Sequence, residues 1–280
     1  MPDLLPGAEI AGCRIEAIAG RGGMGIVYRA TQLSLGRPVA LKLIAPERAS
    51  DAGFRERFER ESRLAAAIDH PNVIPVYGAG EEAGHLYLVM RYVAGTDLQA
   101  LLARERRLAP DRAAAIVGQV AAALDAAHAQ GLIHRDVKPA NVLIEGDGEA
   151  MHCILTDFGL MKNVSAATEP LTKAGSFLGS CDYAAPEQLL GERIDARVDV
   201  YALGCMLFQA VTGEVPFPRP VSAATMLAHM DEPPPVVSEH APDAPRGLDD
   251  VVRTAMAKDP EERYATAGAL GRAAVTATRS

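Results

Sequence analysis

The sequence predicts an α+β protein made of a strand-rich first part and a mostly helical remainder. In the first part, short apolar segments alternate with glycine-containing turns, which is typical of an antiparallel sheet. Beyond about residue 95, apolar residues recur at helical spacing over long segments. A length of 280 residues with 49% hydrophobic and 23% charged residues fits a soluble globular protein with a sizeable core, either one large domain or two lobes.

Composition argues against several classes of function. The formal net charge of -8 disfavours general nucleic-acid binding, because neutralising phosphates requires clustered Lys and Arg. The cysteines are scattered without a CxxC pair, which predicts reduced thiols rather than a zinc cage or a disulfide framework. They are Cys13, Cys153, Cys181 and Cys205. The seven histidines show no HExxH or similar metal-ligand spacing.

No segment of the sequence is typical of targeting or membrane insertion. The first ten residues lack the basic start and apolar core of a signal peptide. The most apolar helical run, 198–211, carries Asp199 and is shorter than the roughly 20 residues that cross a bilayer. We therefore expect a buried helix there and a cytoplasmic protein, or the cytoplasmic domain of a longer membrane-anchored chain.

The chain opens with a glycine-rich turn between strands. Residues 10–19 alternate loosely, residues 20–25 read GRGGMG, and residues 26–29 and 37–44 are strand-like. Glycines at this density predict a strand-turn-strand whose backbone closely approaches another group, most often a phosphate. A dinucleotide-binding fold would need a helix directly after the glycines, so this sequence disfavours it.

Lys42 is a lone lysine inside the apolar run 39–43, on the strand face that it shares with Ala40. By itself it could be an edge lysine that reaches water. However, Phe54, Phe58, Ala65 and Ile68 recur at helical spacing, and Glu61 falls on the same stripe. An acid on an apolar stripe needs a partner, so we expect a Lys42–Glu61 ion pair.

Two further strands complete a small first lobe. We expect them at 73–77 and 86–92, joined by a turn over 78–84. The result is an antiparallel sheet of about five strands with one helix. The predicted organisation is a first lobe over 10–90, a connector over 91–95 and a helical lobe over 96–275.

Helices at 98–107 and 110–129 lead the second lobe, with Gly131 closing the longer one. The stretch 134–141, HRDVKPAN, follows directly, and two short strands at 142–145 and 153–156 come next. Such a hairpin would hold Asn141 and Asp157 at neighbouring ends, as a shared metal site requires.

The remaining segments include one long loop. Residues 157–187 lack periodicity, and a loop of this length inside a compact domain is usually functional. After the buried helix at 198–211 we expect helical segments near 223–230 and 248–258, and a frayed tail over 276–280.

In order and spacing, these motifs resemble the eukaryotic-type (Hanks-type) protein kinases, and GRGGMGxVY with HRDVKPAN is most similar to the bacterial serine/threonine kinases. The resemblance covers about residues 10–273. It implies a bilobal fold, ATP with Mg²⁺ (or Mn²⁺), protein substrates, transfer of the γ-phosphate to Ser/Thr hydroxyls, and autophosphorylation of the activation loop.

In the first lobe, the resemblance assigns a nucleotide site. The glycines would cover the phosphates, Lys42 would hold the α- and β-phosphates and be positioned by Glu61, and Met90 would be the gatekeeper. The glycines concerned are Gly20, Gly22 and Gly25. Val27 and Ala40, with Leu143 of the second lobe, would line the adenine, and the backbone of Arg91, Tyr92 and Val93 would recognise it.

In the second lobe, the resemblance assigns the chemistry. Asp136 would accept the substrate hydroxyl proton, Lys138 would neutralise the γ-phosphate, and Asn141 and Asp157 would hold the metal. Lys138 and the Gly179-Ser180 pair before Ala185-Pro186-Glu187 match Ser/Thr rather than Tyr specificity.

The resemblance also assigns regulation and support. Arg135 before Asp136 implies control by a phosphate on the activation loop, and Thr172 matches the site best. Glu187 would pair with Arg263, and Asp199 would brace the catalytic loop. Relatives often pair through their small lobes to activate in trans, so we expect a homodimer of that kind.

Two alternative classes are less consistent with the sequence. A pseudokinase scaffold usually lacks the lysine, the proton acceptor or the metal-binding acid, whereas Lys42, Asp136 and Asp157 are all present. A small-molecule phosphotransferase would lack the long loop ending in APE. The sequence departs from the family pattern in having small Ala19 and Ala65 at usually larger positions, and in having Thr172 alone where relatives often have two threonines.

Overall fold

The structure is a computed structural model that describes residues 4–22, 25–158 and 181–279. The chain forms two compact units. The first comprises Met1–Asp69 and Val73–Ala94, and the second comprises His70–Asn72 and Gly95–Ser280. Three residues of the predicted first lobe, His70–Asn72, thus belong to the second unit. The change of unit at Ala94 falls within the predicted connector.

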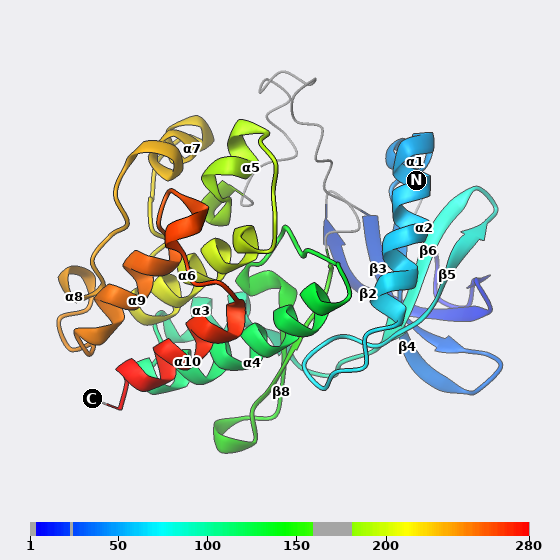
Figure 1. Cartoon of the computed structure of the whole chain (residues 1–280). Helices are drawn as coiled ribbons and strands as arrows, with labels where there is room; N and C mark the ends of the chain where they lie inside the picture. The colour runs from blue at the N-terminus through cyan, green and yellow to red at the C-terminus, as the bar shows by residue number, and fades with distance from the viewer. Residues whose placement is uncertain (1–3, 23–24, 159–180, 280) are drawn as a thin grey trace. The chain divides into compact units, whose positions relative to one another are not determined.

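The first unit is built on one antiparallel sheet with strand order β1-β2-β3-β4-β6-β5 (Figure 1). Its strands are β1 Glu9–Ile10, β2 Cys13–Gly22, β3 Gly25–Gln32, β4 Arg37–Ile44, β5 Val76–Glu82 and β6 His85–Arg91. One core of this unit packs the apolar faces of β2, β3 and β4 together, with Tyr28 and Leu41 fully buried.

Helix α2 (Ala52–Ala66) follows the short α1 (Pro46–Ala49). The helix begins where Asp51 Oδ1 accepts the Phe54 N–H at 2.8 Å. Its buried stripe contains Phe54, Phe58 and Ala65, and Glu61 lies in the same stripe as the spacing predicted. Ile68 lies beyond the end of the helix.

The position of β5 corrects the sequence analysis. Residues 73–77 were expected to be the strand and 78–84 the turn, but β5 runs from Val76 to Glu82 and only Ala83-Gly84 turns. The glycines that suggested a turn lie within the strand, where each meets a local structural requirement. Gly78 follows a break in register, and a Cβ on Gly80 would meet Tyr87 Oη at 2.8 Å, so glycine makes room for that ring.

The second unit is mostly helical, with a small sheet of order β7-β8-β9. Its helices are α3 Leu98–Glu105, α4 Pro110–Ala129, α5 Pro186–Leu190, α6 Arg197–Thr212, α7 Ser222–Asp231, α8 Val237–His240, α9 Gly247–Ala255 and α10 Ala267–Ala277. Its strands are β7 Thr96–Asp97, β8 Val142–Glu145 and β9 His152–Leu155. Short 3-10 turns lie at Pro139–Asn141, Gly148–Ala150, Cys181–Tyr183 and Pro260–Glu262.

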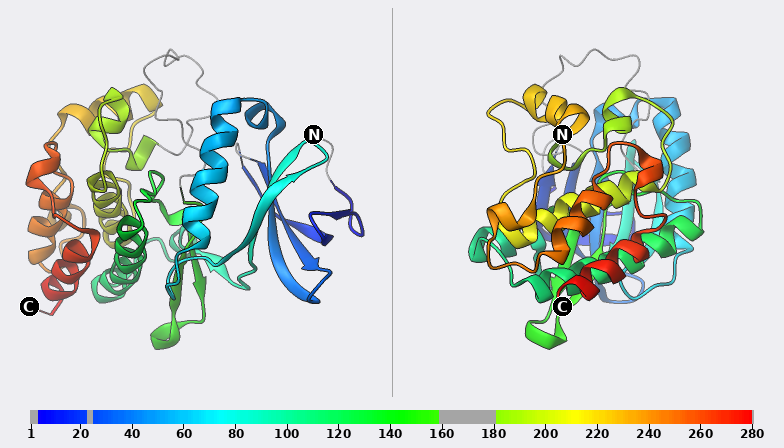
Figure 2. Two further views of the ribbon diagram at one scale, coloured as in Figure 1. Left: turned by 45° about the vertical axis from the view of Figure 1, so that its right-hand side comes forward. Right: turned by 60° about the vertical axis from the view of Figure 1, so that its left-hand side comes forward.

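Helix α6 forms the centre of this unit and is buried along nearly its whole length, as its sequence predicted. Helices α4 and α9 pack against it, and α10 lies beside α4 (Figure 2). In the described part of the chain, no helix combines the length and apolarity that crossing a bilayer requires. The antiparallel-sheet unit and the helical unit together confirm the predicted α+β fold.

The end of the chain corrects a second expectation. Residues 276–280 were expected to fray, but α10 continues to Ala277. Ala277 is buried, and its Cβ lies 3.1 Å from where a Cβ on Gly247 would be. The small residues at both positions let α10 pack closely against the start of α9.

Candidate active site

The stretch 134–141 is held in place by the buried helix α6. Asp199 Oδ2 accepts the backbone N–H of His134 at 2.8 Å, and Asp199 Oδ1 accepts that of Arg135 at 2.7 Å. Asp199 is fully buried, so these bonds offset the desolvation of its carboxylate. The bracing role that the resemblance assigned to Asp199 is therefore confirmed.

Two residues of the site have a left-handed backbone. Arg135 has φ +63° and Asp157 has φ +59°. Such angles cost a non-glycine residue of the order of 1–3 kcal/mol, and they persist only where the surroundings fix the chain. Both backbone groups of Arg135 are held: its N–H donates to Asp199, and its carbonyl accepts a hydrogen bond from Gln188 Nε2 at 3.2 Å.

Asp136 is the centre of a polar cluster. Its Oδ2 lies 2.8 Å from Lys138 Nζ and 3.2 Å from Asn141 Nδ2, which also donates to the Asp136 carbonyl at 2.7 Å. The Asp136 side chain is only 8% exposed, so these charge-assisted bonds fix the carboxylate in one orientation. The sequence predicted this set of residues but not the contacts among them.

The β8–β9 hairpin brings Asn141 next to the start of the Asp157 segment. Val142 pairs with Leu155, and the Thr156 N–H donates to the Asn141 carbonyl at 2.9 Å, one step further along the ladder. Asn141 and Asp157 therefore lie at neighbouring ends of one hairpin, as predicted. Both Asn141 Nδ2 contacts go to Asp136, so the amide oxygen Oδ1 is directed to the other side.

This donor chemistry fits a hard divalent cation. An amide oxygen at Asn141 and a carboxylate at Asp157 are oxygen ligands, which Mg²⁺ prefers, and Mg²⁺ usually takes its other ligands from water and phosphates. Asn141 and Asp157 could therefore hold such an ion beside Asp136.

His134 links the loop to the same hairpin. Its Nε2 lies 2.9 Å from the Thr156 carbonyl, so Nε2 carries the proton and donates, while Nδ1 accepts the Asp136 N–H at 3.2 Å. Burial lowers the pKa of His134, and both contacts suit the neutral ring. The Phe158 ring packs on it with centroids 4.9 Å apart.

In the first unit, four of the residues predicted to bind the nucleotide have their side chains on one face of the sheet. Val27 is the cross-strand partner of Lys42, and Ala40 is that of Met90. Ala40 and Lys42 are two residues apart in β4, so all four side chains point to the same side. The sequence predicted the shared face of Ala40 and Lys42; the register adds Val27 and Met90.

Lys42 and Glu61 are 5% and 4% exposed, respectively, and both belong to this unit. Their ion pair stays a prediction. At the end of β6, the Arg91 N–H donates to the Pro75 carbonyl at 2.9 Å, and the Arg29 guanidinium lies over the Tyr92 ring. Val93 follows in the segment that leads to the second unit.

The glycines of the first hairpin differ in what surrounds them. Gly25 has φ +140°, and a Cβ there would lie 1.9 Å from the Leu43 carbonyl oxygen. Its close approach is thus to a neighbouring strand of its own sheet, a reason the sequence analysis did not consider. A Cβ on Gly20 or Gly22 would meet no described atom within 4 Å.

The other predicted residues have mixed outcomes. Leu143 lies in β8 opposite Ile154 and is half-buried. Glu187 and Arg263 form the predicted ion pair, 2.6 Å from Nη1 to Oε1. Thr172 and Ser180 lie outside the described residues, so the predictions for them stay predictions.

Sequence reasoning missed His128. Its Nε2 lies 2.7 Å from Asp199 Oδ2, which gives that carboxylate a third partner. His128 follows Leu124 by four residues on the buried stripe of α4, and this spacing was a usable signal. A polar residue at that position needs a buried partner, just as Glu61 does.

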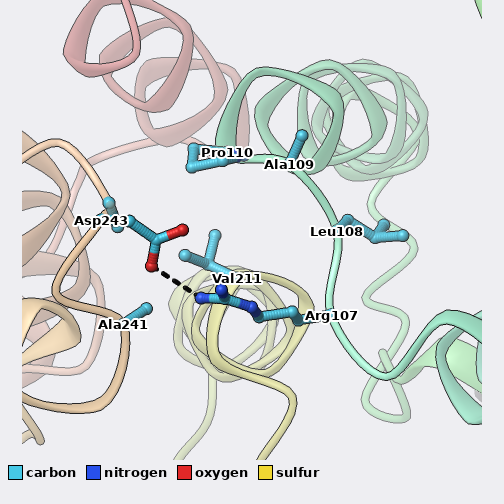
Figure 3. A pocket seen from close by; sticks show the side chains of 8 residues that line it. Arg107, Leu108, Ala109, Pro110, Val211, Ala241 and Asp243 are labelled. Carbon is cyan, nitrogen blue, oxygen red and sulfur yellow. Dashed lines mark hydrogen bonds and ion pairs between the residues drawn. The ribbon is translucent and has the colours of Figure 1, made fainter.

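A pocket of about 250 Å³ lies elsewhere in the second unit (Figure 3). Leu108, Pro110 and Val211 contribute apolar surface, and Arg107 and Asp243 face each other across it at 2.7 Å. None of its lining residues belongs to the candidate active site.

The strand-rich unit and the mostly helical unit together form the bilobal architecture that the resemblance implied. The protein kinase domain model matches residues 14–273, and the chain belongs to the protein kinase family. This result confirms the resemblance found in the sequence.

Similar proteins with names are kinases of the same family. The chain is 43% identical over 278 residues to serine/threonine-protein kinase PknJ of Mycobacterium tuberculosis, covering 98% of this chain and 47% of PknJ. It is 45% identical over 262 residues to PknH of the same species, covering 93% of this chain and 41% of PknH. The chain thus spans less than half the length of these relatives.

Solved structures show the same fold. The crystal structure of the M. tuberculosis PknI kinase domain matches with a TM-score of 0.81 at 32% identity, over 99% of this chain and 100% of that one. A single mutant and a double mutant of that domain match with TM-scores of 0.79 and 0.80, respectively.

Proposed function

We propose that this chain is the catalytic domain of a serine/threonine protein kinase, which transfers the γ-phosphate of ATP to Ser or Thr hydroxyls of proteins. The observation that carries the proposal is the Asp136 cluster. A buried carboxylate with Lys138 at 2.8 Å and Asn141 at 3.2 Å, on a loop braced by Asp199, is an arrangement suited to in-line transfer between oxygens.

In this proposal each residue of the loop has one task. Asp136 orients the incoming hydroxyl group and accepts its proton. Lys138 holds a positive charge next to the place where negative charge develops on the transferred group. Asn141 keeps the Asp136 carboxylate in its orientation through Nδ2 and offers Oδ1 to the metal. When bound, Mg²⁺ supplies charge neutralisation at the phosphate oxygens.

The first unit would bind the nucleotide. Lys42 would hold the α- and β-phosphates and Glu61 would position Lys42, which is supported by the burial of both side chains. Val27, Ala40 and Met90 would contact the adenine, which is supported by their shared face. The backbone of residues 91–93 would recognise the adenine edge, and Gly20, Gly22 and Gly25 would cover the phosphates.

Regulation belongs to the same proposal. Thr172 would receive the activating phosphate, and the Arg135 guanidinium would bind it. Ser180 would belong to the loop that receives the substrate segment. The support is the sequence pattern together with the position of Arg135, whose backbone is fixed from both sides.

The test is intact mass after expression in a host without related kinases. We expect added phosphate in the wild type and none in Asp157→Asn, with Asp136→Asn as a second inactive variant. Phosphosite mapping would then be expected to find Thr172, and Thr172→Ala should slow phosphorylation of an added substrate. Absence of both self-phosphorylation and MgATP-dependent transfer to added protein would reject the proposal in favour of a nucleotide-binding scaffold.

Assembly and location extend the proposal. We place a homodimer contact on the first unit, supported by Leu33 and Leu35, which are exposed at the β3–β4 turn. Light scattering of Leu35→Asp should then give a smaller species than the wild type at equal concentration. A cytoplasmic location is supported by four cysteines that are all buried free thiols.

A further inference from the structure

Strand β9, which leads into Asp157, has an outer edge that Gln119 and Asn72 close. Among the described residues, β9 pairs with β8 on one side only, because it is the outer strand of the β7-β8-β9 sheet. On its other side, Met151, Cys153 and Leu155 present their backbone groups. An edge strand with unpaired groups slips in register or pairs elsewhere.

Gln119 of α4 binds the first part of this edge. Its Nε2 donates to the Met151 carbonyl at 3.2 Å, and its Oε1 accepts the Cys153 N–H at 2.8 Å. The Gln119 side chain therefore makes the two bonds that a neighbouring strand residue would make.

Asn72 binds the second part. Its Nδ2 donates to the Cys153 carbonyl at 2.7 Å, and its backbone carbonyl accepts the Leu155 N–H at 2.8 Å. Asn72 Nδ2 also donates to Gln119 Oε1 at 3.1 Å, which joins the two residues. The polarity of the backbone groups fixes the orientation of both amides, since each carbonyl needs an N–H and each N–H needs an oxygen.

Asn72 belongs to the segment His70–Asn72. This segment is part of the second unit, although the residues before and after it belong to the first. The segment has further anchors: His152 Nε2 lies 2.9 Å from the Pro71 carbonyl, and His70 Nδ1 accepts the Asn72 N–H at 3.1 Å. Asn72 is 8% exposed. Replacing either amide by an apolar side chain would leave buried backbone groups of β9 without partners.

We propose that Gln119 and Asn72 are positioning residues for phosphoryl transfer, an inference that rests on the proposed function. By closing the outer edge of β9 they fix the register in which Thr156 bonds to Asn141 and to His134. That register sets where Asp157, with its left-handed backbone, presents its carboxylate. Residues that orient a metal ligand typically change metal affinity or activity by about 10- to 100-fold when they are lost.

The test compares Gln119→Met with Gln130→Met, the same change at an exposed position at the end of the same helix. With casein as substrate, Gln119→Met should lower kcat about 10-fold or more and raise the Mg²⁺ concentration needed for half-maximal rate, with KM for casein changed less than about twofold. Gln119→Glu keeps both accepted bonds but places a charged carboxylate oxygen against the Met151 carbonyl, so it should also lower kcat. Gln130→Met should match the wild type.

Amide hydrogen exchange provides a readout without turnover. The Thr156 N–H bonds to Asn141 and touches neither amide directly, so its faster exchange in Gln119→Met would report lost register. If Gln119→Met does not fold, Gln119→Glu and Asn72→Asp carry both measurements. Unchanged Thr156 exchange, or an unchanged kcat and Mg²⁺ requirement in an active protein, overturns the inference. If the wild type transfers no phosphate, the proposed function fails, and Thr156 exchange alone decides whether Gln119 sets the register.

Discussion

Arg263 holds Glu187 in a two-pronged ion pair, Nη1 to Oε1 at 2.6 Å and Nη2 to Oε2 at 2.9 Å, with both side chains almost fully buried. Arg263 also donates to the backbone carbonyls of Ala257, Arg197 and Lys258. One guanidinium thus ties the start of α5 to the start of α6 and to the segment after α9.

Glu187→Gln is expected to be strongly destabilising. It leaves the Arg263 charge buried without its counter-ion, which typically costs about 3–5 kcal/mol in the free energy of unfolding. Urea denaturation measures this change. The matched control is Asp250→Asn, which breaks the exposed pair with Arg253 and should cost less than about 1 kcal/mol. Equal effects of the two variants would contradict the prediction.

Asp199→Asn should reduce phosphate transfer without unfolding the chain. Both carboxylate oxygens accept backbone N–H groups, so an amide NH₂ must face one of these donors and release part of the loop. We expect kcat to fall about 100-fold, the size of effect that a displacement of about 1 Å of a reacting group produces. His128→Asn removes only one of the three partners of Asp199 and should have a smaller effect. Circular dichroism checks that both variants fold.

Gly25→Ala and Gly20→Ala should differ sharply. The first puts a Cβ within 1.9 Å of the Leu43 carbonyl oxygen at φ +140°, whereas the second puts it where no described atom lies within 4 Å. We expect Gly25→Ala to lower stability by more than about 1 kcal/mol, and Gly20→Ala to change it by less than that. Thermal unfolding of the two variants side by side measures the difference. A stable Gly25→Ala protein would show that β3 and β4 can separate locally.

His229 is expected to make the protein less stable in mild acid. Its ring is buried, with Nδ1 2.9 Å from Tyr201 Oη and Lys258 nearby, and burial lowers its pKa from 6.5 to about 4. Between these two pH values the unfolded chain binds a proton at this histidine and the folded chain does not. The contribution of His229 to stability is therefore complete above about pH 6.5 and lost towards about pH 4, by up to about 3 kcal/mol.

The measurement for His229 is the free energy of unfolding at about pH 7 and about pH 4.5, in the wild type and in His229→Asn. Asparagine can keep a hydrogen bond to Tyr201 and does not titrate in this range. The wild type should lose more stability between the two pH values than the variant does. Parallel losses would show that other groups cause the acid sensitivity.

Local pattern was enough to predict much of the fold and the site. The lone Lys42 in an apolar strand, the acid on the stripe of α2, the caps of α4 and the hairpin after residue 141 all follow from local periodicity and turn signals. The strand β5 was placed wrongly because glycine marks turns and also makes room for a large neighbour, and only the position of Tyr87 distinguishes the two cases.

Contacts between distant residues could not be predicted in this way. Asn72 reaches Gln119 across 47 residues and Cys153 across 81. Nothing in the periodicity of α4 distinguishes Gln119 from a residue that faces solvent. The positive φ of Arg135 likewise depends on partners from other segments, since arginine has no preference for that region.

Because His70–Asn72 belong to the second unit, a single cut cannot separate the two units of this chain. A cut after Ala94 looks natural because the unit changes there, yet a fragment starting at Gly95 would lack the peptide that covers β9. Such a fragment would leave the Cys153 carbonyl and the Leu155 N–H without their Asn72 partners at this strand edge, and it should self-associate. Adding a short peptide spanning residues 68–75 to the fragment should restore a monomer, because the peptide supplies Asn72 again.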